Sequence, residues 1–408
     1  MIETLSFEKK RELNKLFLSV AENLDITETQ FNNLTRSYNA VGKYLEDDPN
    51  FKDYHPVVTP QGSLRLGTII QPITEDGDLD VDLVYRLIEK HPNWTQKHIK
   101  QMVGLRLRTH GVYSDMLDKK EGRRCWTLLY RQDSDNVKER YHMDILPCVA
   151  DSKFNSNMEL YRSKSFSSIK LDNIAIRITD NKAPNYDNST LIIDWLKSNP
   201  DGYAMWFADR CKYYTEKREN ITDTIMPIGK YIKNKSVLQR IVQILKRHRD
   251  IMFKDDEDKP ISIIITTLAA RAYKGEDSLL EGLVNVISTM ENYITKAQSG
   301  NYVISNPTNS EENFADKWPT HPKRKENFFR WLRQVKSDVN SIISATGIEL
   351  RENVGRSFGD AFSKKLFNLL TEQHKVSAIN GGIKIASTGA LGSIGKTLNA
   401  KNTFYGKK

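Results

Sequence analysis

Three aspartates, Asp78, Asp80 and Asp82, occupy every second position of the stretch GDLDVDLVY, and apolar residues separate them. Side chains along a strand alternate between its two faces, so the three carboxylates would share one face, with Cα atoms roughly 7 Å apart from one to the next. Like charges in such a row repel one another unless a cation lies among them. The pattern predicts a strand with a metal-binding face; a solvated, charged strand edge that blocks aggregation is the alternative.

A further aspartate, Asp144, stands among apolar residues in the strand-like run YHMDILPCV. A buried carboxylate without a partner is costly. A metal ion held by Asp80 and Asp82 would supply that partner, and a hydrogen-bonded or ion-paired structural aspartate is the alternative.

The pair Gly62-Ser63 precedes the aspartate stretch. Glycine allows close approach, and backbone N–H groups together with a hydroxyl can hold a phosphate. A plain turn is the alternative for such a pair.

Carboxylates and a phosphate-binding turn are what phosphoryl and nucleotidyl transfer require. Mg²⁺ prefers hard oxygen ligands and binds one or two carboxylates plus substrate phosphates. With two ions, one activates the attacking hydroxyl and the other steadies the triphosphate and leaving group. A third carboxylate beside the hydroxyl can hold the first ion and take the proton.

The composition is that of a folded protein with a phosphate-rich partner. The chain has 408 residues, 38% hydrophobic and 28% charged, with a formal net charge of +9. This charge suits nucleotides or nucleic acid, or a generally basic surface. No apolar run of about 18 residues predicts a membrane helix, and the charged N-terminus lacks the apolar core of a signal peptide. Three widely spaced cysteines, Cys125, Cys148 and Cys211, indicate buried thiols in a reducing cytoplasm.

Hydrophobic periodicity divides the chain into a mixed first half and a helical second half. Helices are predicted at residues 6–24, 26–48 with Thr27 as N-cap, 95–111 ended by Gly111, 191–198, 202–217, 236–253, 261–273, 279–297 and 325–345. Strands are predicted at the aspartate stretch, 124–132 and 139–149, and a loop or lid at 151–188.

This order predicts an α+β fold in which a mixed sheet with flanking helices packs on a helical domain, with the active-site cleft between them. The predicted division is a catalytic core with N-terminal helices at 1–190, an α-helical domain at 191–375 and a Gly-, Ser- and Asn-rich tail with little structure at 376–408.

The motifs GSLRLGT, DLDVDLVY and HMDILP resemble the signature of the polymerase-β-like nucleotidyltransferase superfamily. Within it, the chain is similar to the bacterial cGAS/DncV-like nucleotidyltransferases (CD-NTases), relatives of oligoadenylate synthetase. The segments SNPDGYAMWF, LQRIVQILKRHRD, KPISIIITTLAARAY and NPTNSEENFADKW carry the resemblance over most of the chain.

The resemblance implies that Asp80 and Asp82 are the metal-binding pair and Asp144 the third carboxylate. Asp78 and Asp80 also form an Asp-x-Asp, so a register shifted by two stays open; the order of DVDLVY favours 80 and 82. Gly62 and Ser63 would hold the donor triphosphate.

Other residues would complete the nucleotide site. The resemblance assigns nucleotide contacts to Gln61, Lys246, Ser262 and Asn199. The alternatives are a solvated basic helix end for Lys246, an ordinary cap for Ser262 and a turn at Asn199.

The resemblance implies a cytoplasmic synthase that joins ATP, GTP or other NTPs into a cyclic di- or trinucleotide, using two Mg²⁺ (or Mn²⁺) ions and releasing pyrophosphate. It implies an anti-phage (CBASS-type) role through an effector that responds to the product; neither a membrane nor direct nucleic-acid binding is expected. The rivals are a template-free RNA 3′-end nucleotidyltransferase and a catalytically silent nucleotide-binding scaffold. Base choice, linkage, ring size, trigger, oligomeric state and effector identity are not readable from the sequence.

Overall fold

The computed structural model describes residues 2–73, 78–131, 140–151, 174–211, 228–254, 256–379 and three two-residue strands at 384–385, 391–392 and 397–398. Its contacts group into two compact units, Met1–Lys336 and Ser337–Lys408. All the predicted site residues fall in the first unit. The predicted boundaries at residues 190 and 375 remain predictions.

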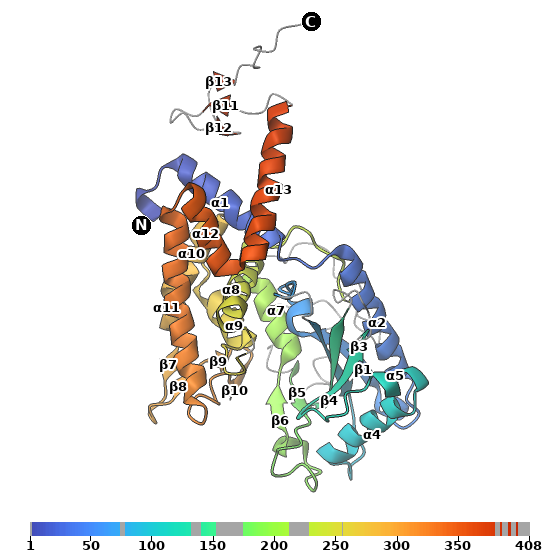
Figure 1. Ribbon diagram of the computed structural model, residues 1–408. Coiled ribbons are helices and arrows are strands. Elements are labelled where there is room, and N and C mark those ends of the chain that lie inside the picture. Colours follow the sequence, from blue (N-terminus) through green and yellow to red (C-terminus); the bar gives the residue numbers. More distant parts are fainter. Residues whose placement is uncertain are drawn as a thin grey trace, which may run out of the picture. The chain divides into compact units, whose positions relative to one another are not determined.

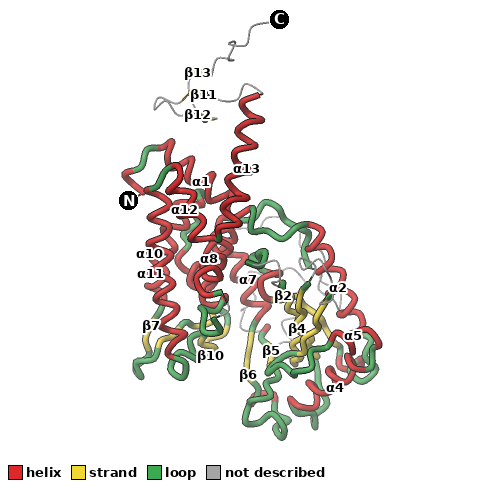
Figure 2. The backbone as a smooth tube through the Cα atoms, in the orientation of Figure 1, coloured by secondary structure: helices red, strands yellow, loops and turns green. Residues whose placement is uncertain are grey.

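A mixed six-stranded sheet forms the centre of the first half of the chain (Figure 2, yellow). Its strands are β1 (Pro56–Gln61), β2 (Leu79–Leu87), β3 (Trp126–Tyr130), β4 (Tyr141–Ala150), β5 (Ile176–Ile178) and β6 (Leu196–Ser198). They lie in the order β1-β2-β4-β5-β6, and β3 also pairs with β4. The neighbouring strands β2 and β4 run parallel to each other, whereas the other pairs described in this sheet are antiparallel.

The two faces of β2 have opposite characters, as the alternation predicts. Leu79, Val81 and Leu83 are buried in the main hydrophobic core. Three helices contribute to that core and lie on the same side of the sheet in Figure 1: α2 (Glu28–Glu46), α4 (Gln96–Arg108) and α5 (Gly111–Met116). The other face therefore carries Asp80 and Asp82 away from the core.

The second half of this unit is mainly helical. Its elements are α7 (Pro200–Arg210), α8 (Val237–Phe253), α9 (Ser262–Ala272), α10 (Leu279–Thr289), the 3₁₀ turn η7 (Met290–Tyr293) and α11 (Pro322–Ser344), which continues into the second unit. The N-terminal helix α1 (Phe7–Glu22) packs on α8 and α10. These elements confirm the predicted α+β class.

The predicted N-cap Thr27 is confirmed, and two helices begin with a capping box. Thr27 accepts from the backbone N–H of Gln30, whose side chain bonds back to Thr27, so this capping box fixes the start of α2. Ser236 and Gln239 make the same arrangement at the start of α8.

Several predicted elements are wrong. Gly111 begins α5 rather than ending the helix before it, which stops at Arg108. The stretch 191–198 forms a 3₁₀ turn, η6 (Ile192–Asp194), and the strand β6 instead of a helix, because β5 offers it an edge to pair with. The predicted loop at 151–188 contains β5, while residues 152–173 lie outside the described residues, as do residues 212–217 of a predicted helix.

Short strands also occur in the helical half: β7 (Thr295–Lys296), β8 (Tyr302–Val303), β9 (Ser305–Asn306) and β10 (Asn309–Asn313). In the second unit, α12 (Gly347–Phe358) packs on α13 (Asp360–Ile379), so helix extends past the predicted start of the unstructured tail at residue 376. Among the described residues, no helix is both long and apolar enough to cross a lipid bilayer.

Candidate active site

Four residues on four neighbouring strands form a row across the sheet. Gln61 of β1 pairs with Asp82 of β2, Asp82 with Asp144 of β4, and Asp144 with Thr127 of β3. We call these residues the cross-strand row. Neighbouring strands lie about 4.8 Å apart, so pairing in register brings the two aspartates side by side.

Thr127 fixes the orientation of Asp144. Its hydroxyl donates to Oδ1 of Asp144 at 2.5 Å, and the thiol of Cys125 also interacts with the Asp144 carboxylate. The lone aspartate of the apolar run thus has a hydrogen-bonded anchor, as the structural alternative predicted, and it also stands beside Asp82, as the catalytic interpretation requires.

Asp82 lies directly against Gly62, the first residue of the short helix α3 (Gly62–Arg65). A Cβ atom at position 62 would come within 1.9 Å of Oδ2 of Asp82, and Gly62 has a φ of +67°. Both the contact and the backbone angle require glycine here. The predicted phosphate-binding turn and the predicted carboxylate therefore meet.

The carboxylates form a concentration of negative charge. Burial, with the neighbouring charges of Asp80 and Asp144, raises the pKa of Asp82 to about 7. Lys246 acts in the opposite direction on the pKa of Asp82 without offsetting the increase.

The structure distinguishes Asp78 from Asp80. Asp78 precedes β2, and its Oδ2 lies 2.6 Å from Nε2 of His142. Asp80 lies on β2 on the same face as Asp82, and its side chain is 79% exposed. His142 also approaches Asp80, with its Nδ1 3.9 Å from Asp80 Oδ1, and both aspartates line the cavity. The closer histidine contact of Asp78 and the greater exposure of Asp80 favour Asp80 and Asp82 as the pair, which remains a prediction.

Lys246 reaches the site from α8. It is buried, its Nζ donates to the carbonyl of Thr68 at 3.1 Å, and burial with the neighbouring Arg249 lowers its pKa to about 8. It is not a solvated helix end. The side chains of Gln239, Gln243 and Arg247 likewise donate to carbonyls within residues 66–72, so α8 holds the stretch that follows α3.

One cavity of about 1270 Å³ contains all the predicted site residues in its wall. They are Gln61, Gly62, Ser63, Asp78, Asp80, Asp82, Asp144, Asn199, Lys246 and Ser262. Residues from the sheet and from the helical half thus surround a shared space.

Two of these residues already have structural partners. Asn199 is the N-cap of α7: its Oδ1 accepts from the N–H of Gly202 at 2.9 Å and its Nδ2 donates to the carbonyl of Thr308 at 2.8 Å. Ser262 accepts from Nη1 of Arg249 at 2.8 Å and is the first residue of α9, whose N-cap is Ile261. Nucleotide contacts by both remain predictions.

The donor set fits a divalent metal that arrives with phosphate. Within the described ranges, no three or more His, Cys, Asp or Glu side chains are gathered closely enough to hold an ion by themselves. Mg²⁺ and Mn²⁺ accept hard carboxylate oxygens, and Mg²⁺ usually takes one or two of them and completes its shell with phosphates and water. Asp80, Asp82 and Asp144 offer such oxygens, and a cation among them would oppose both the burial and the neighbouring carboxylate charges that raise the pKa of Asp82.

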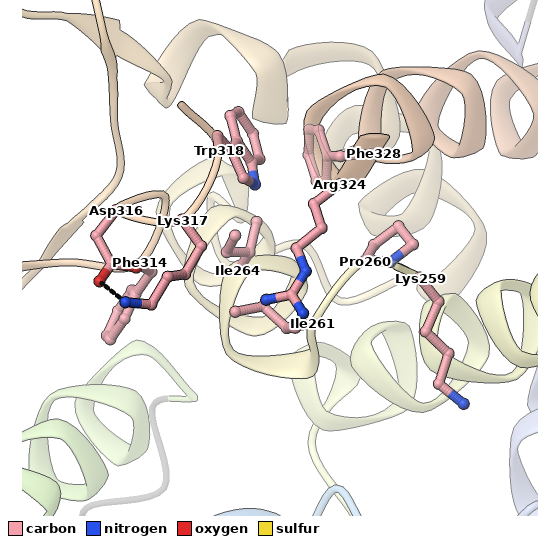
Figure 3. Close-up of a pocket in the computed structure, with 10 residues that line it drawn as sticks. All are labelled: Lys259, Pro260, Ile261, Ile264, Phe314, Asp316, Lys317, Trp318, Arg324 and Phe328. Carbon is pink, nitrogen blue, oxygen red and sulfur yellow. Dashed lines mark ion pairs between the residues drawn. The ribbon is translucent and has the colours of Figure 1, made fainter. Parts of the chain in front are cut away.

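A smaller pocket of about 40 Å³ adjoins this cavity and shares Ile261, Phe314, Asp316 and Lys317 with it (Figure 3). Its wall is largely apolar, and Asp316 and Lys317 form an ion pair at its edge, 3.5 Å apart. No residue of β2 or β4 lines it, so it is not where the carboxylates act.

Sequence reasoning missed the arginines of the cavity wall: Arg65, Arg123, Arg124, Arg177 and Arg249. Most lack a motif of their own. The adjacent pair Arg123-Arg124 gave a usable signal, because it stands at the start of a predicted strand in a chain expected to bind phosphate.

Comparisons with known proteins agree with this geometry. Residues 12–168 match the model of the SMODS family, the Second Messenger Oligonucleotide or Dinucleotide Synthetase domain. A protein of Roseivirga ehrenbergii named c-di-GMP synthase is 29% identical over 406 residues, which cover 97% of this chain and 98% of that protein.

Solved structures share the fold at low sequence identity. The CD-NTase CdnG of Bradyrhizobium diazoefficiens, solved with GTP, has a TM-score of 0.63 at 18% identity, over 88% of this chain and 99% of that one. CdnC of E. coli MS115-1, solved with ATP, has a TM-score of 0.57 at 13% identity, over 86% and 98%. These likenesses confirm the predicted nucleotidyltransferase fold.

Proposed function

We propose that this chain, which belongs to the bacterial cGAS/DncV-like nucleotidyltransferases (CD-NTases), joins nucleoside triphosphates into a cyclic oligonucleotide second messenger and releases pyrophosphate. In each step a ribose hydroxyl oxygen of one nucleotide attacks the α-phosphorus of another and loses its proton. A new P–O bond forms there as the bond between the α-phosphorus and pyrophosphate breaks.

One observation carries the proposal: Asp82 and Asp144 stand side by side in the cross-strand row, against Gly62 and within one cavity with Lys246. Asp80 and Asp82 would hold divalent ions, and Asp144, oriented by Thr127, would stand beside the attacking hydroxyl and accept its proton. Gly62 and Ser63 would hold the donor triphosphate, with Lys246 contacting its oxygens.

Two Mg²⁺ or Mn²⁺ ions would supply charge neutralisation of the triphosphate and activation of the hydroxyl. Carboxylates of β2 and β4 would hold these ions. A divalent cation there would stabilise the charged form of Asp82, whose pKa is raised first by burial and then by the charges of Asp80 and Asp144. Removing divalent ions with a chelator should therefore abolish product formation.

GTP is the first substrate to test, because the Roseivirga relative is named c-di-GMP synthase and CdnG was solved with GTP. Product made in the cytoplasm would act on an effector that responds to cyclic oligonucleotides, in an anti-phage role.

The deciding experiment incubates the protein with each labelled NTP and with all four together, plus Mg²⁺ or Mn²⁺, and identifies products by mass spectrometry. The Asp80→Asn/Asp82→Asn variant should lose at least about 100-fold in rate, because metal-held charge at the reacting phosphate is removed. Product unchanged by this double substitution would refute the site.

Single substitutions test the register of the metal pair. Asp82→Asn should be as damaging as the double variant, whereas Asp78→Asn should retain most of the rate, because Asp78 is engaged by His142. The opposite ranking would assign the pair to Asp78 and Asp80.

A further inference from the structure

Two adjacent arginines, Arg123 and Arg124, lie in the cavity wall just before β3. The Nε of Arg123 donates to Asp180 Oδ1 at 2.7 Å, and the Nε of Arg124 donates to Asp180 Oδ2 at 3.1 Å. The Asp180 side chain is fully buried, whereas the two arginine side chains are 43% and 42% exposed. One buried carboxylate thus holds two guanidinium groups at the surface of the cavity.

This arrangement is built into the fold rather than left to flexible side chains. The backbone N–H of Asp180 donates to Gln96 at 2.9 Å, and the N–H of Asn181 donates to the carbonyl of Arg123 at 2.9 Å. The buried Lys100 also donates to the carbonyl of Arg123, at 3.1 Å. These hydrogen bonds therefore fix both backbone segments, the one that carries Arg123 and Arg124 and the one that carries Asp180.

The pair has charge left for a ligand. Two guanidinium groups share the one carboxylate of Asp180, so this triad alone carries a net charge of +1; Glu312, also in the cavity wall, interacts electrostatically with Arg124 and offsets part of that charge. The bonds to Asp180 use the Nε atoms, so the terminal nitrogens are not used in them. Terminal guanidinium nitrogens are the donors that bind phosphate oxygens in pairs.

The position of the pair complements that of the predicted donor site. At one end of the cross-strand row, Gly62 directly follows Gln61 of β1 in the chain. At the other end, Arg124 lies three residues before Thr127 of β3. The row from β1 to β3 spans about 14 Å at a strand spacing of about 4.8 Å. The carboxylates of Asp82 and Asp144 lie between these two ends.

The cavity has room for two nucleotides. Its volume of about 1270 Å³ exceeds that of a typical pocket for one small ligand, about 300–1,000 Å³. A reaction between two nucleotides needs a second set of phosphate contacts, on the far side of the reacting atoms from the first.

We propose that Arg123 and Arg124, held by Asp180, form the phosphate-binding site of the second nucleotide, the one whose ribose hydroxyl attacks. This inference rests on the proposed function and assigns its acceptor side. Asp180 is a positioning residue: it orients the arginines and does not touch the nucleotide.

The test counts nucleotides bound. The α,β-methylene analogues of the four NTPs are titrated into the protein with Mg²⁺ by isothermal calorimetry, and the best-bound analogue is used throughout. Wild type should bind two equivalents. Arg123→Ala/Arg124→Ala should bind one, and its product assay should show a rise in KM of at least about 10-fold, as expected for lost charged phosphate contacts.

Matched variants separate charge from geometry. Arg330→Ala/Arg333→Ala removes two exposed arginines of α11 that do not line the cavity, and it should bind two equivalents as wild type does. Arg123→Lys/Arg124→Lys keeps the charge but not the paired donors, and it should fall between wild type and the alanine variant. If the alanine variant does not fold, this lysine variant carries the test.

The outcomes are distinguishable from failure of the proposed function. The arginine site would be overturned if the alanine or lysine variant bound two equivalents with unchanged affinity, or if wild type bound a single equivalent. Loss of product in Asp80→Asn/Asp82→Asn would still support catalysis in that case. Product unchanged in that aspartate variant would instead reject the proposed function.

Discussion

At the scale of single residues, the contact between Gly62 and Asp82 joins the predicted phosphate-binding turn to the strand that carries the predicted metal ligands. Gly62 has a φ of +67° and faces Oδ2 of Asp82 so closely that a Cβ atom would lie 1.9 Å from it. The side chain that a substitution adds would therefore displace the carboxylate.

Gly62→Ala should abolish product and lower stability by about 1–2 kcal/mol or more, because a non-glycine residue in the left-handed region costs that much before the clash is counted. Gly111→Ala is the control, since a Cβ there meets nothing within 4 Å; it should change stability by less than about 0.5 kcal/mol. Thermal unfolding and product assays on both variants test the contrast, which equal effects would contradict.

The carboxylate cluster should cost stability when no cation is bound. The pKa of Asp82 is raised to about 7, so its charged form destabilises the fold, and this cost grows as the pH rises from about 4 to 7 and persists above. Asp82→Asn should therefore raise the metal-free unfolding free energy at pH 8 by about 1 kcal/mol or more, with little gain at pH 4. Urea unfolding with a chelator measures this, and a variant less stable than wild type at pH 8 would contradict it.

The identities of the carboxylates could be predicted from the sequence, because alternation along a strand is local. The residues that orient these carboxylates or shift their pKa values could not be predicted. Thr127 is 17 residues from Asp144 and meets it only through strand pairing, and Lys246 approaches from a helix more than 160 residues beyond Asp82. Asn199 was predicted as a nucleotide contact, but its amide caps a helix and bonds to Thr308, a partner 109 residues away.

At the scale of elements, a buried ionic network ties α7 to β2 and α3. Asp201 of α7 accepts from Arg86 of β2 at 2.7 Å and also pairs with Arg65 of α3. Although burial opposes it, the two guanidinium groups hold the pKa of Asp201 down at about 2. This network attaches the helix that begins at Asn199 to the strand that carries Asp80 and Asp82.

Asp201→Asn should destabilise the protein by about 3–5 kcal/mol at pH 7, because two buried cations lose their partner. The depressed pKa means that this stabilisation is present above about pH 4 and disappears as the pH falls toward 2, so the difference should shrink at pH 3. The exposed pair Lys97–Asp187 is the control, and Asp187→Asn should cost at most about 1 kcal/mol. Urea unfolding at pH 7, 5 and 3 tests this, and a pH-independent difference would refute it.

Elements with strong local signals were predictable and those decided by neighbours were not. The hydrophobic periodicity predicts a helix at 236–253, and α8 (Val237–Phe253) begins one residue later and ends at the same residue. Residues 191–198 have the composition of a helix, yet they become η6 and β6, because pairing with β5 outweighs local preference. The position of β5 depends in turn on its contact with β4, which the sequence does not reveal.

At the scale of the whole first unit, the cavity brings together the sheet and the helical half. Its wall includes Asp82 and Asp144 on strands and Lys246 and Ser262 on helices. A nucleotide bound there would contact both parts, so binding should stabilise the folded state as a whole.

Mg²⁺ with the best-bound α,β-methylene NTP should raise the stability by about 2.7 kcal/mol at 100 times the Kd, and less when either component is omitted, because the metal and triphosphate complete one site. Differential scanning calorimetry of wild type measures the shift. The Asp80→Asn/Asp82→Asn variant should show a smaller one, and an equal shift in that variant would mean that the nucleotide binds elsewhere.

The cross-strand row also bears on how such a protein can diverge. A single residue inserted into β2 would place every later side chain on the opposite face of the sheet. Carboxylates would then lie in the hydrophobic core, and leucines would be exposed to water. Selection can therefore tolerate length changes between strands far more readily than within them. The helical wall of the cavity is free of this constraint, because none of its side chains is placed by the pairing of β2.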